Sequence, residues 1–439
     1  MNRLEDKAVG CLVGSAVGDA LGGATEGWSP AQIQDRYGGW VDGVVPPFHP
    51  DWREARPIAP YHKGDGHITD DTLMTHALVE VYAKRRDHLD AYAVATDLVP
   101  LLITSKRWIP ELEQEALLLS RVFLAEKWLV ARLHYGHVDP REAGVGNIVN
   151  CGAAMYAAPI GIANAANPGA AYAEAIDLAG AHQSSYGREA AGVYAAAVAA
   201  AMTVGATPES IVDTCLALAR DGTRAAIDAV RGVAAGLADP AAAVPALRAA
   251  VAPFDPVGPD YRNPGLDARR PSRTRSIEEL PVALGMLLVA RGRYRDAVLG
   301  AVNYGRDADS IASMAGGICG ALGGSAAVPA SWREQVSAAS RLDLEAAGRV
   351  MAEVATEIFS RDEQRRRAHA AAFAELAGLA EPTGLAEPAG PAGPAGPAEP
   401  TELAGLAEPS EPALPIEAEA TEPAEPTGRR GGDGPGQCG

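Results

Sequence analysis

Residues 303–320 read Asn-Tyr-Gly-Arg-Asp-Ala-Asp-Ser-Ile-Ala-Ser-Met-Ala-Gly-Gly-Ile-Cys-Gly. Asp307 and Asp309 are two positions apart, Ser310 follows, and the small and apolar residues after it predict a tightly packed helix. Gly305 permits a sharp turn into that helix. Side chains at positions i and i+2 of a helix point about 200° apart, so the two carboxylates converge only from a turn or a first helical turn. Taken alone, the stretch indicates a helix cap, because Asp is a common capping residue.

A second cluster far upstream has the same chemistry. Thr69-Asp70-Asp71-Thr72 opens a helical pattern over residues 73–82, so a hydroxyl again lies beside two carboxylates at a helix entry. Two such clusters in one chain predict a single oxygen-rich site. Carboxylates held together repel and raise each other's pKa unless a cation neutralises them. All-oxygen ligands, without His or Cys at metal spacing, favour Mg²⁺, Mn²⁺ or Ca²⁺ over zinc.

Near the N-terminus, glycines recur at every fourth position, at Gly10, Gly14 and Gly18. Each glycine costs a helix about 1 kcal/mol relative to alanine, so the spacing predicts another helix packed closely on that face. Asp19 then lies in a tight, buried place and needs a hydrogen-bonding partner. Glu26 follows in a glycine-flanked turn, where the local pattern alone indicates a solvated loop acid.

The chain has 439 residues and a net charge of −18. Residues 377–439 repeat Glu-Pro and Ala-Gly-Pro and have few large apolar side chains, so we expect a disordered tail. This tail has eleven acidic residues and two arginines, a net −9, which is half of the total charge. Residues 4–375 are expected to form one domain. The acidic balance argues against direct nucleic-acid binding but not against a small anionic substrate.

The fold class is predicted as all-α, a compact multi-helix domain, since no alternating strand pattern and no fixed repeat is found. Residues 88–137 are expected to form amphipathic helices, with Trp108 and Trp128 in the core or an interface. Residues 171–203 form an alanine-rich helix with a polar break at 181–187, where His182 either lines a site or only bonds a turn. Residues 41–68 and 252–276 lack a helical period, and the second segment resembles a surface loop or lid.

The five cysteines form no CxxC pair. Four of them, Cys11, Cys151, Cys215 and Cys319, have apolar Ala/Gly-rich neighbours and are expected to be buried small hydrophobic residues. That usage is typical of a reducing cytoplasm. The N-terminal residues lack the apolar run of a signal peptide, and no stretch is a convincing membrane span. We expect a cytoplasmic monomer that does not act at a membrane.

Three motifs in this order resemble the ADP-ribosylglycohydrolase family: Gly18-Asp-Ala-Leu-Gly22 with Glu26, Thr69-Asp-Asp-Thr72, and Gly305-Arg-Asp-Ala-Asp-Ser-Ile311. The resemblance covers about residues 4–375 and leaves out the tail. It implies an all-helical fold with two divalent cations, Mg²⁺ or Mn²⁺, at the mouth of a cleft. The metal ligands that it implies are Thr69, Asp70, Asp71, Asp307, Asp309 and Ser310. Glu26 matches the family's glutamate near the metals.

The segment Asn150-Cys-Gly-Ala-Ala-Met-Tyr156 is similar to the family's Gly-Asn-Gly-Ala-Met-Arg loop near the substrate. This resemblance implies substrate contacts at Gly152, Ala153, Met155, His182 and Gly305. The chain departs from the family at Cys151 and Tyr156. Relatives also more often carry Gly-Asp-Thr-Asp-Thr around the second acid pair, and a Thr before the histidine where this chain has Ala181.

The resemblance implies a metal-dependent hydrolase that cleaves the ribosyl bond of an ADP-ribosylated protein side chain or small molecule and releases ADP-ribose. Two cations suit a ribose because its vicinal hydroxyls can bind them and fix the anomeric carbon against water. The carboxylate that activates the water is Glu26, Asp70 or Asp71. The alternatives are a hydrolase of another ribosylated metabolite, suggested by Cys151 and Tyr156, and a non-catalytic ADP-ribose-binding or structural homologue. The intact acid and hydroxyl sets weigh against the last.

Overall fold

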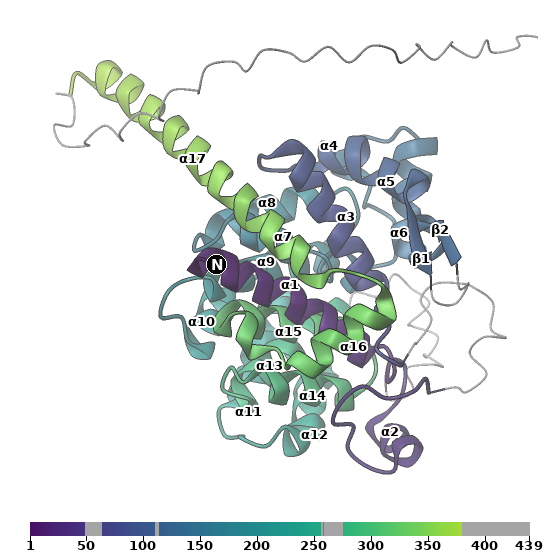
Figure 1. The fold of residues 1–439 in the computed structure, drawn as a ribbon. Helices are drawn as coiled ribbons and strands as arrows, with labels where there is room; N and C mark the ends of the chain where they lie inside the picture. Colours follow the sequence, from purple (N-terminus) through teal and green to yellow (C-terminus); the bar gives the residue numbers. More distant parts are fainter. Residues whose placement is uncertain (49–63, 110–113, 256–257, 259–274, 380–439) are drawn as a thin grey trace, which may run out of the picture. The chain divides into compact units, whose positions relative to one another are not determined.

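The structure is a computed structural model that describes residues 1–48, 64–109, 114–255, 258 and 275–379 (Figure 1). The tail expected at residues 377–439 lies outside these residues from position 380 onward. The same is true of most of the irregular segments expected at 41–68 and 252–276. Within the described part of the chain, no helix combines the length and the apolar character needed to cross a membrane.

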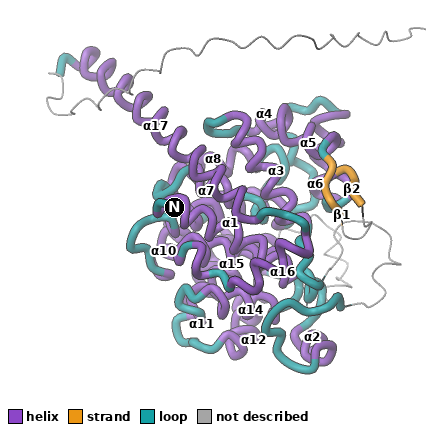
Figure 2. The backbone as a smooth tube through the Cα atoms, in the orientation of Figure 1, coloured by secondary structure: helices purple, strands orange, loops and turns teal. Residues whose placement is uncertain are grey.

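The all-α prediction is confirmed (Figure 2). The helices are α1 (Arg3–Gly22), α2 (Pro30–Tyr37), α3 (Asp70–Arg85), α4 (Ala91–Ala93), α5 (Val99–Thr104), α6 (Leu124–Leu129), α7 (Ala158–Ala163), α8 (Pro168–Ala179), α9 (Ser185–Ala201), α10 (Pro208–Leu218), α11 (Asp221–Ala234), α12 (Pro240–Val251), α13 (Arg275–Val289), α14 (Tyr294–Tyr304), α15 (Ala308–Gly323), α16 (Ala330–Ser340) and α17 (Leu344–Ala377). The polar break expected after the first alanine-rich helix is present between α8 and α9.

One expectation is wrong. Helices were expected throughout residues 88–137, but β1 (Lys106–Ile109) and β2 (Gln114–Leu117) form an antiparallel pair there. Their sequences, Lys-Arg-Trp-Ile and Gln-Glu-Ala-Leu, do not alternate polar and apolar residues, so no strand pattern marks them. Trp108 lies on β1, half-buried, with the Arg341 guanidinium 3.6 Å above its ring centroid. Trp128 is also half-buried, and its Nε1 donates to the Ala143 carbonyl.

Helices α1 and α15 pack backbone against backbone, as the glycine spacing predicts. A Cβ atom at Gly10 would lie 2.5 Å from the Gly320 carbonyl oxygen, and one at Gly14 would lie 2.5 Å from that of Gly316. At Gly18 it would lie 2.1 Å from the Ala312 carbonyl oxygen. Side chains larger than hydrogen therefore cannot stand at these three positions without moving a helix.

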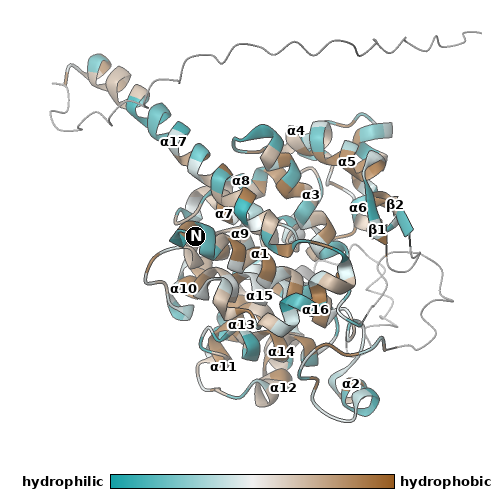
Figure 3. Ribbon diagram, viewed as in Figure 1, coloured by the Kyte–Doolittle hydropathy of each residue, from teal (hydrophilic) through white to brown (hydrophobic). Residues whose placement is uncertain are grey.

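Helix α15 lies at the centre of the packing, because it also contacts α9, α13 and α14. These inner helices are largely apolar, whereas α17, which packs along α1, α3 and α7, carries a polar outer face (Figure 3). Four cysteines are buried and free, as expected: Cys11, Cys151, Cys215 and Cys319. The fifth, Cys438, lies outside the described residues.

Replacing Gly320 by alanine tests the backbone contact. Its Cβ would lie 1.9 Å from the Gly10 carbonyl oxygen, so the helices must separate. We expect Gly320→Ala to lower the free energy of unfolding by about 2–3 kcal/mol in urea denaturation, as for other overpacked sites.

A matched control is Gly232→Ala on α11, where a Cβ would meet nothing within 4 Å. This exposed helical position should gain about 0.5–1 kcal/mol from alanine. Equal effects of the two substitutions would contradict close α1–α15 packing.

Candidate metal centre

Two turns that carry acids, far apart in sequence, are held together by a reciprocal backbone pair. The Gly27 N–H donates to the Arg306 carbonyl at 2.5 Å, and the Arg306 N–H donates to the Trp28 carbonyl at 2.9 Å. Gly305 has φ +71°, and a Cβ there would lie 2.0 Å from the Trp28 carbonyl oxygen, so only glycine fits. This pairing fixes Glu26 beside Asp307, which stands at the N-cap position of α15.

Asp19, at the end of α1, anchors the start of α3. Its carboxylate is fully buried and accepts hydrogen bonds from Thr69 N–H at 3.0 Å, Thr69 Oγ1 at 2.6 Å and Thr72 N–H at 3.1 Å, as well as from the Thr72 hydroxyl. Burial raises the pKa of Asp19, and these hydrogen bonds lower it. The buried partner that the sequence requires for Asp19 is therefore the N-terminus of α3. The Thr69 hydroxyl is used here by Asp19, and its role as a metal ligand stays a prediction.

The structure brings the acids of both sequence clusters together. Ligand atoms of Asp19, Asp71 and Asp309 all lie within 4.8 Å of one another. The same holds for Glu26, Asp307 and Asp309, so the two groups share Asp309. As the i, i+2 spacing requires, Asp307 and Asp309 converge from a turn and a first helical turn.

Asp70 points elsewhere. Its Oδ2 accepts a hydrogen bond from the Phe123 N–H at 3.1 Å, and its Oδ1 lies 3.6 Å from the buried Arg121 guanidinium. Burial raises the pKa of Asp70, and Arg121 opposes this effect. Among the residues that the structure describes, Asp70 belongs to none of the groups of potential metal ligands. Its proposed metal-binding and catalytic roles stay predictions.

The electrostatics of the cluster fit a divalent cation. Burial, and then Asp19 and Asp70, hold the pKa of Asp71 well above its usual range. Burial, and then Glu26 and Asp71, do the same for the pKa of Asp309. Asp71 Oδ1 is buried and has no hydrogen-bond partner in the described part of the chain. An orphaned carboxylate oxygen among other acids is the arrangement that a cation stabilises.

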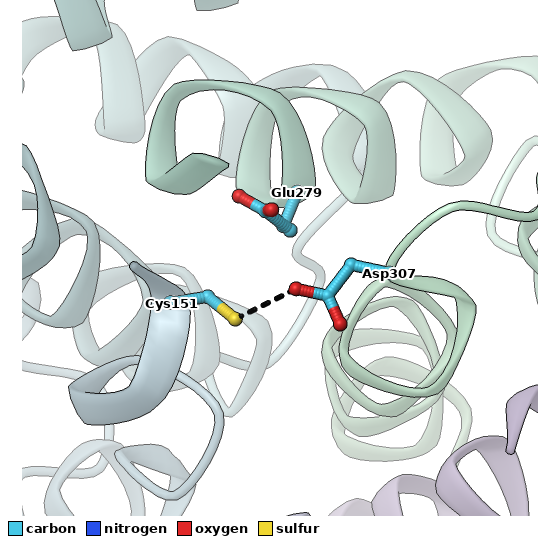
Figure 4. Close-up of side chains that lie close together, drawn as sticks. All are labelled: Cys151, Glu279 and Asp307. Carbon is cyan, nitrogen blue, oxygen red and sulfur yellow. Dashed lines mark hydrogen bonds between the residues drawn. The ribbon is translucent and has the colours of Figure 1, made fainter. Parts of the chain in front are cut away.

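Sequence reasoning missed two residues at this site, Glu279 and the thiol of Cys151 (Figure 4). Glu279 is fully buried on α13, and its ligand atoms, with those of Cys151 and Asp307, lie within 4.8 Å of one another. Cys151 Sγ lies 3.2 Å from Asp307 Oδ2 and 3.4 Å from Ser310 Oγ. The expectation of apolar surroundings for Cys151 is therefore wrong. A pair of glutamates, 278 and 279, at the start of an apolar helix was the available signal.

The predicted substrate loop forms a short 3-10 turn, Cys151–Ala153, next to the acids. Asn150 Oδ1 caps it by accepting from the Gly152 N–H at 3.0 Å, and Gln183 Nε2 donates to the same oxygen. A Cβ at Gly152 would lie 2.4 Å from Glu126 Oε1, so the loop and α6 approach closely. Gly152, Ala153 and Met155 are all buried.

His182 lies beneath this loop. Its ring is fully buried, with Nδ1 2.9 Å from the Tyr156 hydroxyl and Nε2 3.0 Å from the Ala125 carbonyl oxygen. Both ring nitrogens thus have protein partners and tie the loop to α6. A direct contact of His182 with substrate stays a prediction, as do those of the loop residues and Gly305.

A cavity of about 1270 Å³ adjoins the paired turns. Its lining includes the side chains of Trp28, Trp40, Val244, Arg248, Tyr304 and Arg306. The Trp28 ring, which lines this cavity, stacks on Phe48 with centroids 3.6 Å apart.

Residues 1–367 match the family model described as ADP-ribosylglycohydrolase. The chain belongs to this family. It is 23% identical over 340 residues to the uncharacterized protein YegU of Escherichia coli strain K12, covering 77% of this chain and 94% of that protein. A solved structure titled ADP-ribosylglycohydrolase-related protein complex matches with a TM-score of 0.55 and 20% identity, covering 81% of this chain and all of that one. The structural likeness shows the fold, and membership places the chain among glycohydrolases of the ADP-ribosyl type.

Replacing Asp71 by asparagine separates repulsion from metal binding. A carboxyl pKa that is raised by folding destabilises the protein as pH rises above about 4, the ordinary value of an unfolded Asp. Without divalent cations, Asp71→Asn should therefore be more stable than the wild type at pH 7.5, with a smaller difference at pH 5.

With Mn²⁺ at about 100 times its Kd, the wild type should gain about 2.7 kcal/mol in unfolding free energy, and Asp71→Asn less than half of that. Denaturation with and without chelator measures both quantities. A metal-free variant that is less stable than the wild type at pH 7.5 would contradict the repulsion.

Proposed function

We propose that this ADP-ribosylglycohydrolase family member is a divalent-metal-dependent hydrolase that cleaves the ribosyl bond of an ADP-ribosylated protein side chain or small molecule, releasing ADP-ribose. The proposal rests on one observation: two clusters of acidic residues share Asp309. One cluster adds Asp19 and Asp71, and the other adds Glu26 and Asp307. A bridging carboxylate between two sets of oxygen ligands is typical of two-metal sites. We propose two Mg²⁺ or Mn²⁺ ions, held by Asp71, Asp307 and Asp309 with the hydroxyls of Thr69 and Ser310.

When bound, these cations would hold the ribose hydroxyls and polarise an attacking water. The residues of the chain hold the acids of the centre in position. The reciprocal backbone bonds between the turn of Glu26 and that of Arg306 keep Glu26 at the edge of the Asp307–Asp309 group. Asp19 is occupied by four donors from α3, so it supports the site rather than exchanging protons.

Glu26 is our candidate for the general base. It is the most exposed of the buried acids of the centre, at 7% against 0% for Asp19 and 2% for Asp309. In the reaction, the water oxygen bonds to the anomeric carbon and Glu26 accepts the water's proton. The modified group leaves with the electron pair of the broken bond and takes up a proton from solvent. The surrounding carboxylates favour the positive charge that develops at the anomeric carbon.

A second candidate substrate class, another ribosylated metabolite, is favoured by Tyr156. Relatives carry Arg at this loop position, but here the Tyr156 ring is fully buried and its hydroxyl bonds to His182. Position 156 therefore offers no cation to a diphosphate. In either case we propose a cytoplasmic monomer that acts without binding nucleic acid.

Substrate assays with Asp309→Ala test the proposal. Purified protein is incubated with arginine-, serine- and nucleic-acid-linked ADP-ribose in Mg²⁺ or Mn²⁺, and free ADP-ribose is measured. We expect metal-dependent release by the wild type and at least about a 100-fold slower rate in Asp309→Ala, equivalent to about 2.7 kcal/mol. The control Asp213→Ala removes an exposed acid of α10 and should keep full activity.

Calorimetric titration with ADP-ribose makes the second measurement. Metal-loaded protein should bind ADP-ribose, and chelated protein far more weakly, because uncompensated carboxylates repel a diphosphate. Equal affinity in both states, or unchanged turnover of Asp309→Ala at saturating metal, would refute the metal-dependent mechanism. Metal-induced stabilisation without any ADP-ribose binding would keep the metal centre and favour the second substrate class.

A further inference from the structure

Cys151 places a sulfur atom at the edge of an otherwise oxygen-lined centre (Figure 4). Three elements contribute to this edge: the turn at Cys151–Ala153, α13 with Glu279, and the turn before α15 with Asp307. Their ligand atoms all lie within 4.8 Å of one another, and Asp307 also belongs to the group with Glu26 and Asp309. Through Asp307, the Cys151 sulfur therefore adjoins the proposed two-metal site.

The distances suit shared coordination. With metal–sulfur bonds of about 2.3 Å and metal–oxygen bonds of about 2.1 Å, two cis ligands of one ion lie about 3.1–3.6 Å apart. Cys151 Sγ is 3.2 Å from Asp307 Oδ2 and 3.4 Å from Ser310 Oγ. The thiol donates a hydrogen bond to Asp307. Independently, Asp71 Oδ1 in the adjoining acid cluster is buried without a hydrogen-bond partner among the described residues, which favours a bound cation there.

The thiol is also held in place. Its residue is 4% exposed, and the carbonyl of Cys151 accepts hydrogen bonds from the Ala154 and Met155 N–H groups at 2.6 and 3.0 Å. The Asn150 cap fixes the turn from the other end.

We propose that Cys151 is a thiolate ligand of the metal centre and shifts its preference from Mg²⁺ toward thiophilic divalent ions such as Co²⁺, Zn²⁺ and Cd²⁺. The inference rests on the proposed metal centre. On binding, the S–H bond is exchanged for a metal–sulfur bond and the proton is released to solvent. No change of oxidation state is involved.

Cobalt titration of the full chain tests the ligand directly. Thiolate bound to Co²⁺ gives a near-ultraviolet charge-transfer band that oxygen ligands do not give. We expect this band in the wild type, its loss in Cys151→Ser and in Cys151→Ala, and its retention in the control Cys438→Ser. Circular dichroism verifies that each variant is folded, and the alanine variant serves if the serine variant is not.

Competition between ions gives a second readout. The Cd²⁺ affinity relative to that of Mg²⁺ should fall at least tenfold in Cys151→Ser, while Mg²⁺ affinity changes less than about twofold. A wild type without the band, or a band that persists in both Cys151 variants, would overturn the proposal. If the band follows Cys151 but no ADP-ribose is released, the ligand assignment holds and only the proposed reaction fails. If ADP-ribose is released but the wild type shows no Co²⁺–thiolate band, the proposed reaction holds and the assignment of Cys151 as a ligand fails.

Discussion

The centre depends on how closely two helices approach. Because α1 and α15 meet backbone to backbone, the end of α1 lies against the start of α15, where a Cβ at Gly22 would be 2.3 Å from the Ala308 carbonyl oxygen. This contact brings Asp19 of one helix and Asp309 of the other into a single group of potential ligands. Ser15 and Ser313 hydrogen-bond at 2.7 Å within the same interface and fix its register. Helices at ordinary spacing of 8–10 Å, kept apart by side chains, would separate these acids.

Burying so many carboxylates is unfavourable, and the fold offsets part of this cost with hydrogen bonds. Asp19 accepts from the backbone and hydroxyl donors that open α3, where the helix dipole also favours a negative charge. It thereby acts as a capping group supplied by another helix. Asp71, in the same first turn, has no such compensation at Oδ1 in the described residues. The acids thus differ: Asp19 is stabilised by hydrogen bonds of the fold, whereas Asp71 keeps an oxygen that could bind a cation.

The sequence was informative wherever a signal was local. The i, i+2 acids, the hydroxyl beside them and the four-residue glycine spacing each report a helix entry or a close contact, and the structure brings these acids together. Glu279 and Cys151 were missed because only the packing of α13 and of the turn at Cys151–Ala153 against α15 carries them to the site. At Cys151 the sequence neighbours are small and apolar, but the spatial neighbour is Asp307, which local composition does not indicate.

Asp70 and Asp71 illustrate a different limit. Both are buried at the start of α3, and the motif treats them alike. Successive helical residues point about 100° apart, so one carboxylate faces Asp19 and Asp309 while the other meets Phe123 and Arg121. Which of the two faces the centre depends on the rotation of α3 about its axis. That rotation is set by the bonds of Asp19, which no local pattern reveals.

Arg306 stabilises the turn that carries Asp307. Arg306 adopts φ +57°, a left-handed conformation that costs a non-glycine residue about 1–2 kcal/mol. Its buried guanidinium offsets this cost by binding Asp255 at 2.8 Å, the Gly258 carbonyl at 2.8 Å and Glu278 at 2.7 Å. Glu278 therefore holds the turn that carries Asp307 from behind, and Glu279, the next residue of α13, faces the centre. The adjacent glutamates therefore contact neighbouring residues of one turn, Arg306 and Asp307, and the ion pairs of Arg306 help to fix the position of Asp307.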